Sequence, residues 1–272
     1  MNDQPQFPEP GVPQIRSVNW PGFLALYVKE VRRFFKVQTQ TIWAPSITTL
    51  LFLVIFTVSL SGTRRAVLGV NFADFIAPGL IVMGMMQNAF ANSSFSLLVA
   101  KIQGTIVDYL MPPLSVAELM SALIAAAVTR AVMVGLCIWL VMLPYPGVHV
   151  APIHWWAVIG FGLLGSTMLA SLGLLTSIWA EKFDHAAAVT NFVIAPAALL
   201  SGTFYSVDKL APAFQAFSHA NPFFYVISGF RYGFIGAADS PVRTGLVLLI
   251  AVNVALALLC YQLLRSGWKI KA

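Results

Sequence analysis

The sequence predicts an all-α integral membrane protein with six transmembrane helices, an amphipathic N-terminal interfacial helix and a re-entrant or outer-leaflet helical hairpin before the last span. Of the 272 residues, 58% are hydrophobic and 10% are charged, with a mean hydropathy of +0.81, whereas a soluble domain carries about 25% charged residues. Six apolar runs are each near the roughly 20 residues that a span needs. This composition excludes a soluble enzyme, a disordered chain and a coiled coil.

The N-terminal segment is expected to be a tail followed by a helix at the membrane surface. Residues 1–17 are acidic, rich in proline and unlike a secretory signal, so we expect a disordered cytoplasmic tail. Within residues 18–38, Asn19 can cap a helix with Pro21 in its first turn. An apolar stripe opposite a cationic face favours an interfacial helix over an ordinary soluble one. The stripe is Phe23, Tyr27, Val31 and Phe34, and the cations are Lys29, Arg32, Arg33 and Lys36.

Residues 39–268 are expected to form one transmembrane domain. Its apolar runs lie at about residues 43–60, 75–100, 119–143, 155–179, 187–205 and 244–264. Residues 206–242 are too apolar for a solvated loop, and neither half spans well. Because non-helical backbone at membrane depth must be covered by protein or water, we expect a re-entrant or outer-leaflet hairpin that turns at Asn221–Pro222.

The distribution of Lys and Arg between the runs predicts the orientation. With the N-terminus inside, ten cations fall on the cytoplasmic side and five on the outer side. This excess predicts that both termini are cytoplasmic, with residues 269–272 as a short tail. The ten are Arg16, Lys29, Arg32, Arg33, Lys36, Lys101, Lys182, Arg265, Lys269 and Lys271; the five are Arg64, Arg65, Lys209, Arg231 and Arg243.

No catalytic motif is present in the sequence. It lacks GxxxxGK[ST], HExxH, GxSxG and a paired-Asp metal motif, and its four histidines lie in separate loops. Cys137 and Cys260 lie inside apolar runs and are expected to be packing residues, and two cysteines are too few for a disulfide framework or a CxxC metal site. We therefore expect no catalytic residue, no metal site and no cofactor in this chain. The basic residues form no single run, so a nucleic-acid partner is not expected.

The stretch KIQGTIVDYLMPPLSVAELMSA, residues 101–122, lies between the second and third runs. A helix is expected at about residues 103–110, stopped by Pro112–Pro113. Thr105, Ile106 and Asp108 would project from it, and a partner that gripped this helix could move two spans at once. A plain cytoplasmic loop is the alternative.

Three motifs in order resemble a known family. Residues 101–113 resemble the coupling helix of the ABC-2 type transporter permeases. They carry the pattern Gly-Thr-Ile-x-Asp-x-Leu, and a Pro-Leu-Ser sequence begins at Pro113. The second run, FIAPGLIVMGMMQNAFANSSFS, is similar to the family's Pro-Gly-Leu entry and Ala-Phe-x-Asn centre, and Asn221-Pro222 followed by Gly229-Phe230-Arg231-Tyr232 resembles its signature before the last span. The resemblance covers roughly residues 20–268 and is nearest to bacterial multidrug and nodulation-factor exporters.

The resemblance implies partners and contact sites. Such permeases work in the bacterial inner membrane as two membrane subunits with two ATP-binding cassette subunits, which hold ATP and Mg. By resemblance, the coupling helix would dock into the ATPase, the loop between the fourth and fifth runs would make a smaller contact, and the amphipathic helix would flank it. The residues implied are Gly104, Thr105, Ile106, Asp108 and Leu110; Glu181, Lys182 and Asp184; and Glu30, Arg32 and Arg33.

Several intramembrane residues have two interpretations. A charge at the helix centre costs roughly 2.5–3.5 kcal/mol, so Arg130 is either functional or a structural arginine bonded to a neighbouring helix, and we favour the structural role. Gly162, Ser166 and Ala170 recur every four residues of the fourth run, which predicts close helix packing. Four amides either line a transport path or join helices: Gln87, Asn88, Asn92 and Asn191. Three aromatic residues form either an aromatic belt or an exit gate: Phe204, Tyr205 and Phe223. A structural role is expected for Asn221, Pro222 and Arg231.

The predicted function is the permease subunit of an ATP-driven exporter that moves an amphipathic cargo, such as a lipid, glycolipid or hydrophobic drug, along a path between two copies. One alternative is an integral-membrane transferase acting on lipid-linked substrates, which would need clustered carboxylates. A secondary transporter usually carries several midplane charges, and only Arg130 qualifies. A structural membrane scaffold is the third alternative. The transferase alternative is disfavoured because the carboxylates are scattered over both sides of the membrane: Asp74, Asp108, Glu118, Asp184 and Asp239.

Overall fold

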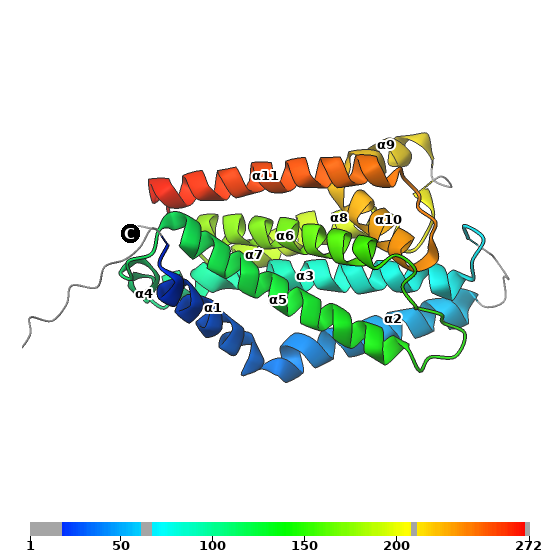
Figure 1. The fold of residues 1–272 in the computed structure, drawn as a ribbon, viewed down its shortest axis with the longest axis horizontal. Coiled ribbons are helices and arrows are strands. Elements are labelled where there is room, and N and C mark those ends of the chain that lie inside the picture. Colours follow the sequence, from blue (N-terminus) through cyan, green and yellow to red (C-terminus); the bar gives the residue numbers. More distant parts are fainter. Residues whose placement is uncertain (1–17, 61–66, 208–210, 270–272) are drawn as a thin grey trace, which may run out of the picture.

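The computed structural model describes residues 18–60, 67–207 and 211–269 and shows a bundle of helices along one long axis (Figure 1). The all-α class is confirmed for these residues, whose one extended pairing is an isolated bridge between Val67 and Val70. The expected tail at 1–17 lies outside the described residues, as does the expected tail at 269–272 except for Lys269. So do Arg16, Arg64, Arg65, Lys209 and Lys271.

The helices follow one another with short connections. In chain order they are α1 (Trp20–Phe35), the π-helix η1 (Thr39–Trp43), α2 (Ala44–Leu60), α3 (Phe72–Ile102), α4 (Val107–Leu110), α5 (Val116–Met142), α6 (Trp155–Trp179), α7 (Phe183–Val189), the π-helix η2 (Thr190–Ile194), α8 (Ala195–Leu199), α9 (Pro212–Ala220), α10 (Pro222–Ile235) and α11 (Val242–Ser266).

Four helices of the described residues are long and apolar enough to cross a membrane. They are Thr39–Ser59, α5, α6 and α11, and they make this chain a multi-pass membrane protein. The second predicted run corresponds to α3, whose 31 residues include many amides and hydroxyls that lower its hydropathy. The fifth corresponds to the shorter apolar helix Phe183–Leu199. Length and composition alone therefore support four of the six expected spans.

Helix α3 is the central element of the bundle, and it packs mainly against α5, α6 and α10 (Figure 1). At about 1.5 Å per residue it is about 46 Å long. Its polar residues Asn88, Asn92, Ser93 and Ser96 are all buried. The polar character that weakens its span signal is thus sheltered by the surrounding helices.

The small-residue stripe of α6 is a packing surface, as predicted. Ser166 and Ala170 are fully buried, and a Cβ added at Gly162 would lie 3.2 Å from both Met85 of α3 and Phe230 of α10. Farther along, a Cβ at Gly173 would lie 2.6 Å from the Phe90 carbonyl oxygen of α3. Close backbone approach of this kind requires small side chains.

Helix α1 packs on α5 near the end of the bundle where α4 lies (Figure 1). Asn19 caps it as predicted, since its side chain accepts a hydrogen bond from the Gly22 N–H at 3.0 Å. Its inward residues are Leu26, Glu30 and Phe34, while Arg32 and Lys36 are exposed. Helix α1 is therefore amphipathic, but its buried face includes one carboxylate.

The segment before α11 contains two helices, α9 and α10, separated at Asn221. Asn221 caps α10 by accepting from the Phe223 N–H at 3.1 Å and donates to the Ala197 carbonyl of α8 at 2.7 Å. Pro222 occupies the first helical position, where its missing N–H costs nothing. The predicted break and the structural role of Asn221 and Pro222 thus follow from ordinary capping.

Candidate functional site

The turn between α3 and α5 forms an exposed tip at one end of the bundle. Gly104 adopts a left-handed conformation with φ of +72°, and the Thr105 N–H donates to the Ala100 carbonyl at 2.8 Å, which closes α3. The chain is helical again only at Val107–Leu110. The expected helix over residues 103–110 is therefore wrong in its first half, because the glycine ends α3 there.

The tip has a distinct outer and inner face. Its outer face combines the carboxylate of Asp108 with the exposed apolar side chains of Val107, Leu110 and Met111, the last of which is 78% exposed. On the inner side, Ile106 is half-buried and Tyr109 is 7% exposed. Of the predicted tip residues, Gly104, Thr105, Asp108 and Leu110 face outward, whereas Ile106 packs inward.

Beneath the tip, Glu30 joins three helices. Its carboxylate accepts from the Tyr109 hydroxyl of α4 at 2.7 Å and from the Ser96 hydroxyl of α3 at 2.8 Å, and it pairs with Arg33 of α1 at 3.0 Å. Glu30 is 1% exposed. Its carboxylate therefore supports the tip from below, which corrects the expectation that it lies at the surface and faces a partner.

Tyr109 and Arg33 extend this cluster in opposite directions. The Lys29 ammonium lies 3.8 Å from the centre of the Tyr109 ring. Burial, followed by the charge of Glu30, raises the pKa of the Tyr109 phenol well above its usual value. Arg33 donates to the carbonyl oxygen of Asn92 at 2.9 Å. A continuous series of polar contacts thus runs from α4 through α1 to the middle of α3.

The turn between α6 and α7 lies beside the end of α3. The Lys101 ammonium donates to the Ile178 carbonyl at 2.8 Å. In this turn Glu181, Lys182 and Asp184 are all exposed, as expected for a second contact surface. Glu181 also pairs with Lys269 at 2.8 Å, and that hydrogen bond lowers the pKa of Glu181.

One strip of α3 is less covered than the rest of the helix. It consists of Met83, Gln87, Ala91 and Phe95, which recur every four residues and are exposed or half-buried. Of the amides predicted to line a path, Gln87 belongs to this strip and Asn191 of η2 is also exposed, whereas Asn88 and Asn92 are buried. We call this surface the α3 strip.

Aromatic side chains lie at the end of the bundle opposite the tip. Phe204 contacts Phe56 of α2 with ring centres 4.6 Å apart, and the Tyr205 hydroxyl donates to the Leu199 carbonyl at 3.1 Å. Phe223 is 5% exposed and belongs to the core. Phe204 and Tyr205 are thus half-buried at a surface, whereas Phe223, expected with them in an aromatic belt or an exit gate, is buried in the core of the single chain.

Arg130 and Arg231 are two buried or half-buried arginines with different surroundings. Arg231 is fully buried, pairs with Asp239, and donates to the carbonyl oxygens of Phe75 at 3.1 Å and Gly202 at 2.8 Å. Arg130 of α5 donates to Asn88 of α3 at 2.9 Å. Both bond to neighbouring helices or loops, which agrees with structural roles.

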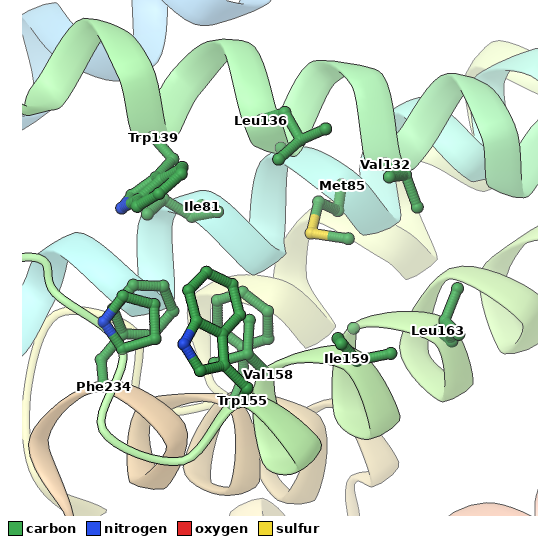
Figure 2. Close-up of a pocket in the computed structure, with 14 residues that line it drawn as sticks. Ile81, Met85, Val132, Leu136, Trp139, Trp155, Val158, Ile159, Leu163 and Phe234 are labelled. Atoms are coloured by element: carbon green, nitrogen blue, oxygen red, sulfur yellow. The ribbon is translucent and has the colours of Figure 1, made fainter.

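An apolar cavity of about 200 Å³ lies between α5 and α6, with α3 behind it (Figure 2). Trp139 and Leu136 of α5 face Trp155 and Ile159 of α6 across it, and Met85 of α3 closes its base (Figure 2). Its apolar lining is suited to hydrocarbon and offers no group for chemistry.

The carboxylates are engaged in separate contacts. Asp74 accepts from the His149 N–H at 2.6 Å, Glu118 accepts from the Ser115 N–H at 2.7 Å, and Asp239 pairs with Arg231. No three potential metal ligands gather among the residues with a described placement. These three carboxylates thus accept hydrogen bonds or form an ion pair at separate places in the fold. A metal-dependent transferase would need carboxylates close together.

The geometry is thus that of a multi-pass helical protein with an exposed tip between α3 and α5, the second and third long helices after α1. The ABC-2 type transporter family matches residues 21–235. The chain is 36% identical over 250 residues to the inner membrane transport permease YadH of Escherichia coli (strain K12), covering 91% of this chain and 96% of that protein. It is 28% identical over 209 residues to nodulation protein J of Rhizobium leguminosarum bv. viciae, covering 72% and 78%. The chain belongs to the ABC-2 type transporter family, and the predicted resemblance is confirmed.

Sequence reasoning missed Tyr109, Ser96 and Asp239. Tyr109 lies three residues after Ile106, and this spacing could have placed both on one inward face. Ser96 lies among the polar residues of the second run, but nothing local indicates that it bonds to Glu30, 66 positions away. The same holds for the pairing of Asp239 with Arg231, which depends on how the chain turns after α10.

Proposed function

We propose that this chain is the permease subunit of an ATP-driven exporter in the bacterial inner membrane. Two copies would assemble with two ATP-binding cassette subunits, which would bring ATP and Mg, since the chain lacks a phosphate-binding loop. The observation that carries the proposal is the exposed α3–α5 tip, joined by Tyr109, Glu30 and Arg33 to the transmembrane helices. The relatives' names, which include an inner membrane transport permease, support the location.

In the membrane we propose six spans: α2, α3, α5, α6, the segment α7–η2–α8, and α11. Helix α3 is long enough, and its polar residues are covered by neighbours. The hairpin α9–α10 would enter the outer leaflet without crossing it. Both termini would be cytoplasmic, so that the tip, the α6–α7 turn and Arg32 face the ATPase, which is consistent with the cytoplasmic excess of Lys and Arg.

The transport path would follow the α3 strip, between two copies of the chain. Gln87 and Asn191 are exposed in the single chain, and an amide that faces lipid without a partner is costly. A second copy or a polar cargo would cover them. An amphipathic cargo, such as a lipid, glycolipid or hydrophobic drug, suits a path that offers amides and aromatic rings with few charges. Transport of small hydrophilic ions alone would contradict this cargo class.

Co-purification tests the proposed assembly. The tagged chain, isolated in mild detergent, is expected to bring with it a protein identified by sequencing as carrying GxxxxGK[ST]. Asp108→Arg should lower its recovery at least about tenfold, because reversing a charge at a docked contact costs several kcal/mol. The control Arg243→Glu reverses an exposed charge at the other end of the bundle and should change nothing. Equal recovery with Asp108→Arg would refute the tip as the coupling site.

A further inference from the structure

A mainly apolar groove that also contains two arginines lies where α1 and η1 meet α3 and α5, at the α1 end of the α3 strip. Its volume is about 150 Å³, below the roughly 300–1,000 Å³ of sites that hold a whole drug-sized ligand. Arg33 and Arg130 line it together with Asn92, and most of the remaining lining is apolar and includes Val37 and Phe95. The groove is thus the size of one chemical group of a larger molecule.

The charges in the groove are unbalanced. Arg33 pairs with Glu30 at 3.0 Å. Arg130 donates to the neutral amide of Asn88, and in the described part of the chain no carboxylate lies within ion-pair distance of it. An ion removed from water without a counter-ion is unfavourable, so Arg130 gives the groove a positive charge that no carboxylate of the described residues neutralises.

Two buried donors in the groove residues also have no acceptor. The Nε atom of Arg130 and the Nδ2 atom of Asn92 are both buried and make no hydrogen bond. Buried donors in native proteins are nearly always satisfied. Arg130 and Asn92, which lie on adjacent helices and line one groove, therefore each keep one unused donor, and this favours an acceptor that comes from outside the described part of the chain.

We propose that this groove binds the phosphate group of an anionic amphiphile. Phosphate oxygens match the planar donor fork of a guanidinium, and Arg is the usual residue for such recognition. The apolar part of the molecule would lie along Val37 and Phe95, which are 50% and 39% exposed. The inference rests on the proposed function in taking the α3 strip as the path, because the groove would hold the headgroup at the start of that path.

The test measures lipid binding by the full-length protein in neutral detergent. Fluorescent phosphatidylglycerol and diacylglycerol with identical acyl chains, the second of which lacks the phosphate, are titrated, and binding is followed by fluorescence anisotropy. We expect phosphatidylglycerol to bind at least about tenfold more tightly, because hydrogen bonds to a charged group contribute about a factor of ten or more to affinity. We expect Arg130→Gln to remove this preference. Arg130→Lys keeps the charge without the fork and should retain part of the preference. If Arg130→Gln does not fold, Arg130→Lys is the variant whose lipid preference is compared with that of the wild type.

The matched control is Arg265→Gln, which removes an exposed cation at the same end of the bundle and should leave the preference unchanged. Equal binding of the two lipids, or a full preference in folded Arg130→Gln, would overturn the site. Inorganic phosphate is added as a competitor: displacement of the lipid at similar concentrations would overturn the amphiphile and assign the site to a soluble anion. ATPase co-purification is scored separately, so a wild-type protein that still brings the ATPase with it but shows no lipid preference refutes only the groove.

Discussion

Glu30 shows how a carboxylate can be buried near a membrane-spanning core. Its two oxygen atoms receive the hydroxyls of Tyr109 and Ser96 and the guanidinium of Arg33. A buried charge is tolerated when it is paired and its remaining lone pairs are hydrogen-bonded. Because its donors come from three helices, the position of α4 is tied to the positions of α1 and α3.

At alkaline pH we expect Tyr109 to stay protonated after ordinary tyrosines ionise, because its pKa is raised above the usual 10.0. Since the folded pKa exceeds the unfolded pKa, its contribution to stability is complete below about pH 10 and is lost as pH rises through the folded pKa. In an ultraviolet titration, wild-type and Tyr109→Phe should give equal tyrosinate absorbance near pH 10, and wild-type should gain one more tyrosinate only at higher pH. A smaller signal for Tyr109→Phe near pH 10 would contradict the buried contact.

Arg231 and Asp239 form an ion pair that joins α10 to the segment before α11, with side chains 0% and 1% exposed. We expect Asp239→Asn to lower the free energy of unfolding by about 3–5 kcal/mol, because it leaves a guanidinium buried without its counter-ion. Reversible unfolding in detergent measures the change. Asp184→Asn, at an exposed position, should stay within about 0.5 kcal/mol. If Asp239→Asn lowers the free energy of unfolding no more than Asp184→Asn does, the ion pair does not stabilise the protein.

At the scale of elements, the contact between α3 and α6 depends on glycine. A Cβ at Gly173 would lie 2.6 Å from the Phe90 carbonyl oxygen, whereas a Cβ at Gly160 would meet nothing within 4 Å. We expect Gly173→Ala to destabilise the protein by about 1–3 kcal/mol through overpacking. Gly160→Ala, on the same helix, should be neutral or stabilise by up to about 1 kcal/mol through helix propensity. Thermal unfolding compares the two, and an unaffected Gly173→Ala would show that the helices can separate at no cost.

Element boundaries were predictable where local signals decide them. Asn19, Asn221 and Pro222 mark helix starts through capping, and the structure agrees with all three. The first half of the expected helix over residues 103–110 is wrong, because Gly104 adopts a left-handed conformation that ends α3. The fifth run predicts a helix that continues to about residue 205, but the structure ends this apolar helix at Leu199.

At the scale of the whole molecule, the exposed Gln87 predicts contact between two copies. In a variant with Cys137 and Cys260 replaced by alanine, Gln87→Cys should form a covalent dimer with a short bifunctional maleimide in native membranes, because the α3 strip faces its counterpart. Val254→Cys is the control, since Val254 of α11 is 53% exposed and α11 is the least buried of the four candidate spans. Dimers from Val254→Cys with none from Gln87→Cys would place the interface on α11 instead.

The class of protein followed from composition and motif order, because hydropathy and short motifs are local properties of the chain. The all-helical architecture, the capping residues and the family could therefore be derived without coordinates. Which side chain of each helix faces its neighbours depends on packing between residues far apart in sequence. Only the tertiary structure could show that Glu30 is buried beneath Tyr109, that Phe223 lies in the core, and that Arg33 and Arg130 line one groove. Burial and pairing of charges are decided by long-range contacts, and the residues that carry the proposed coupling and binding are determined at that level.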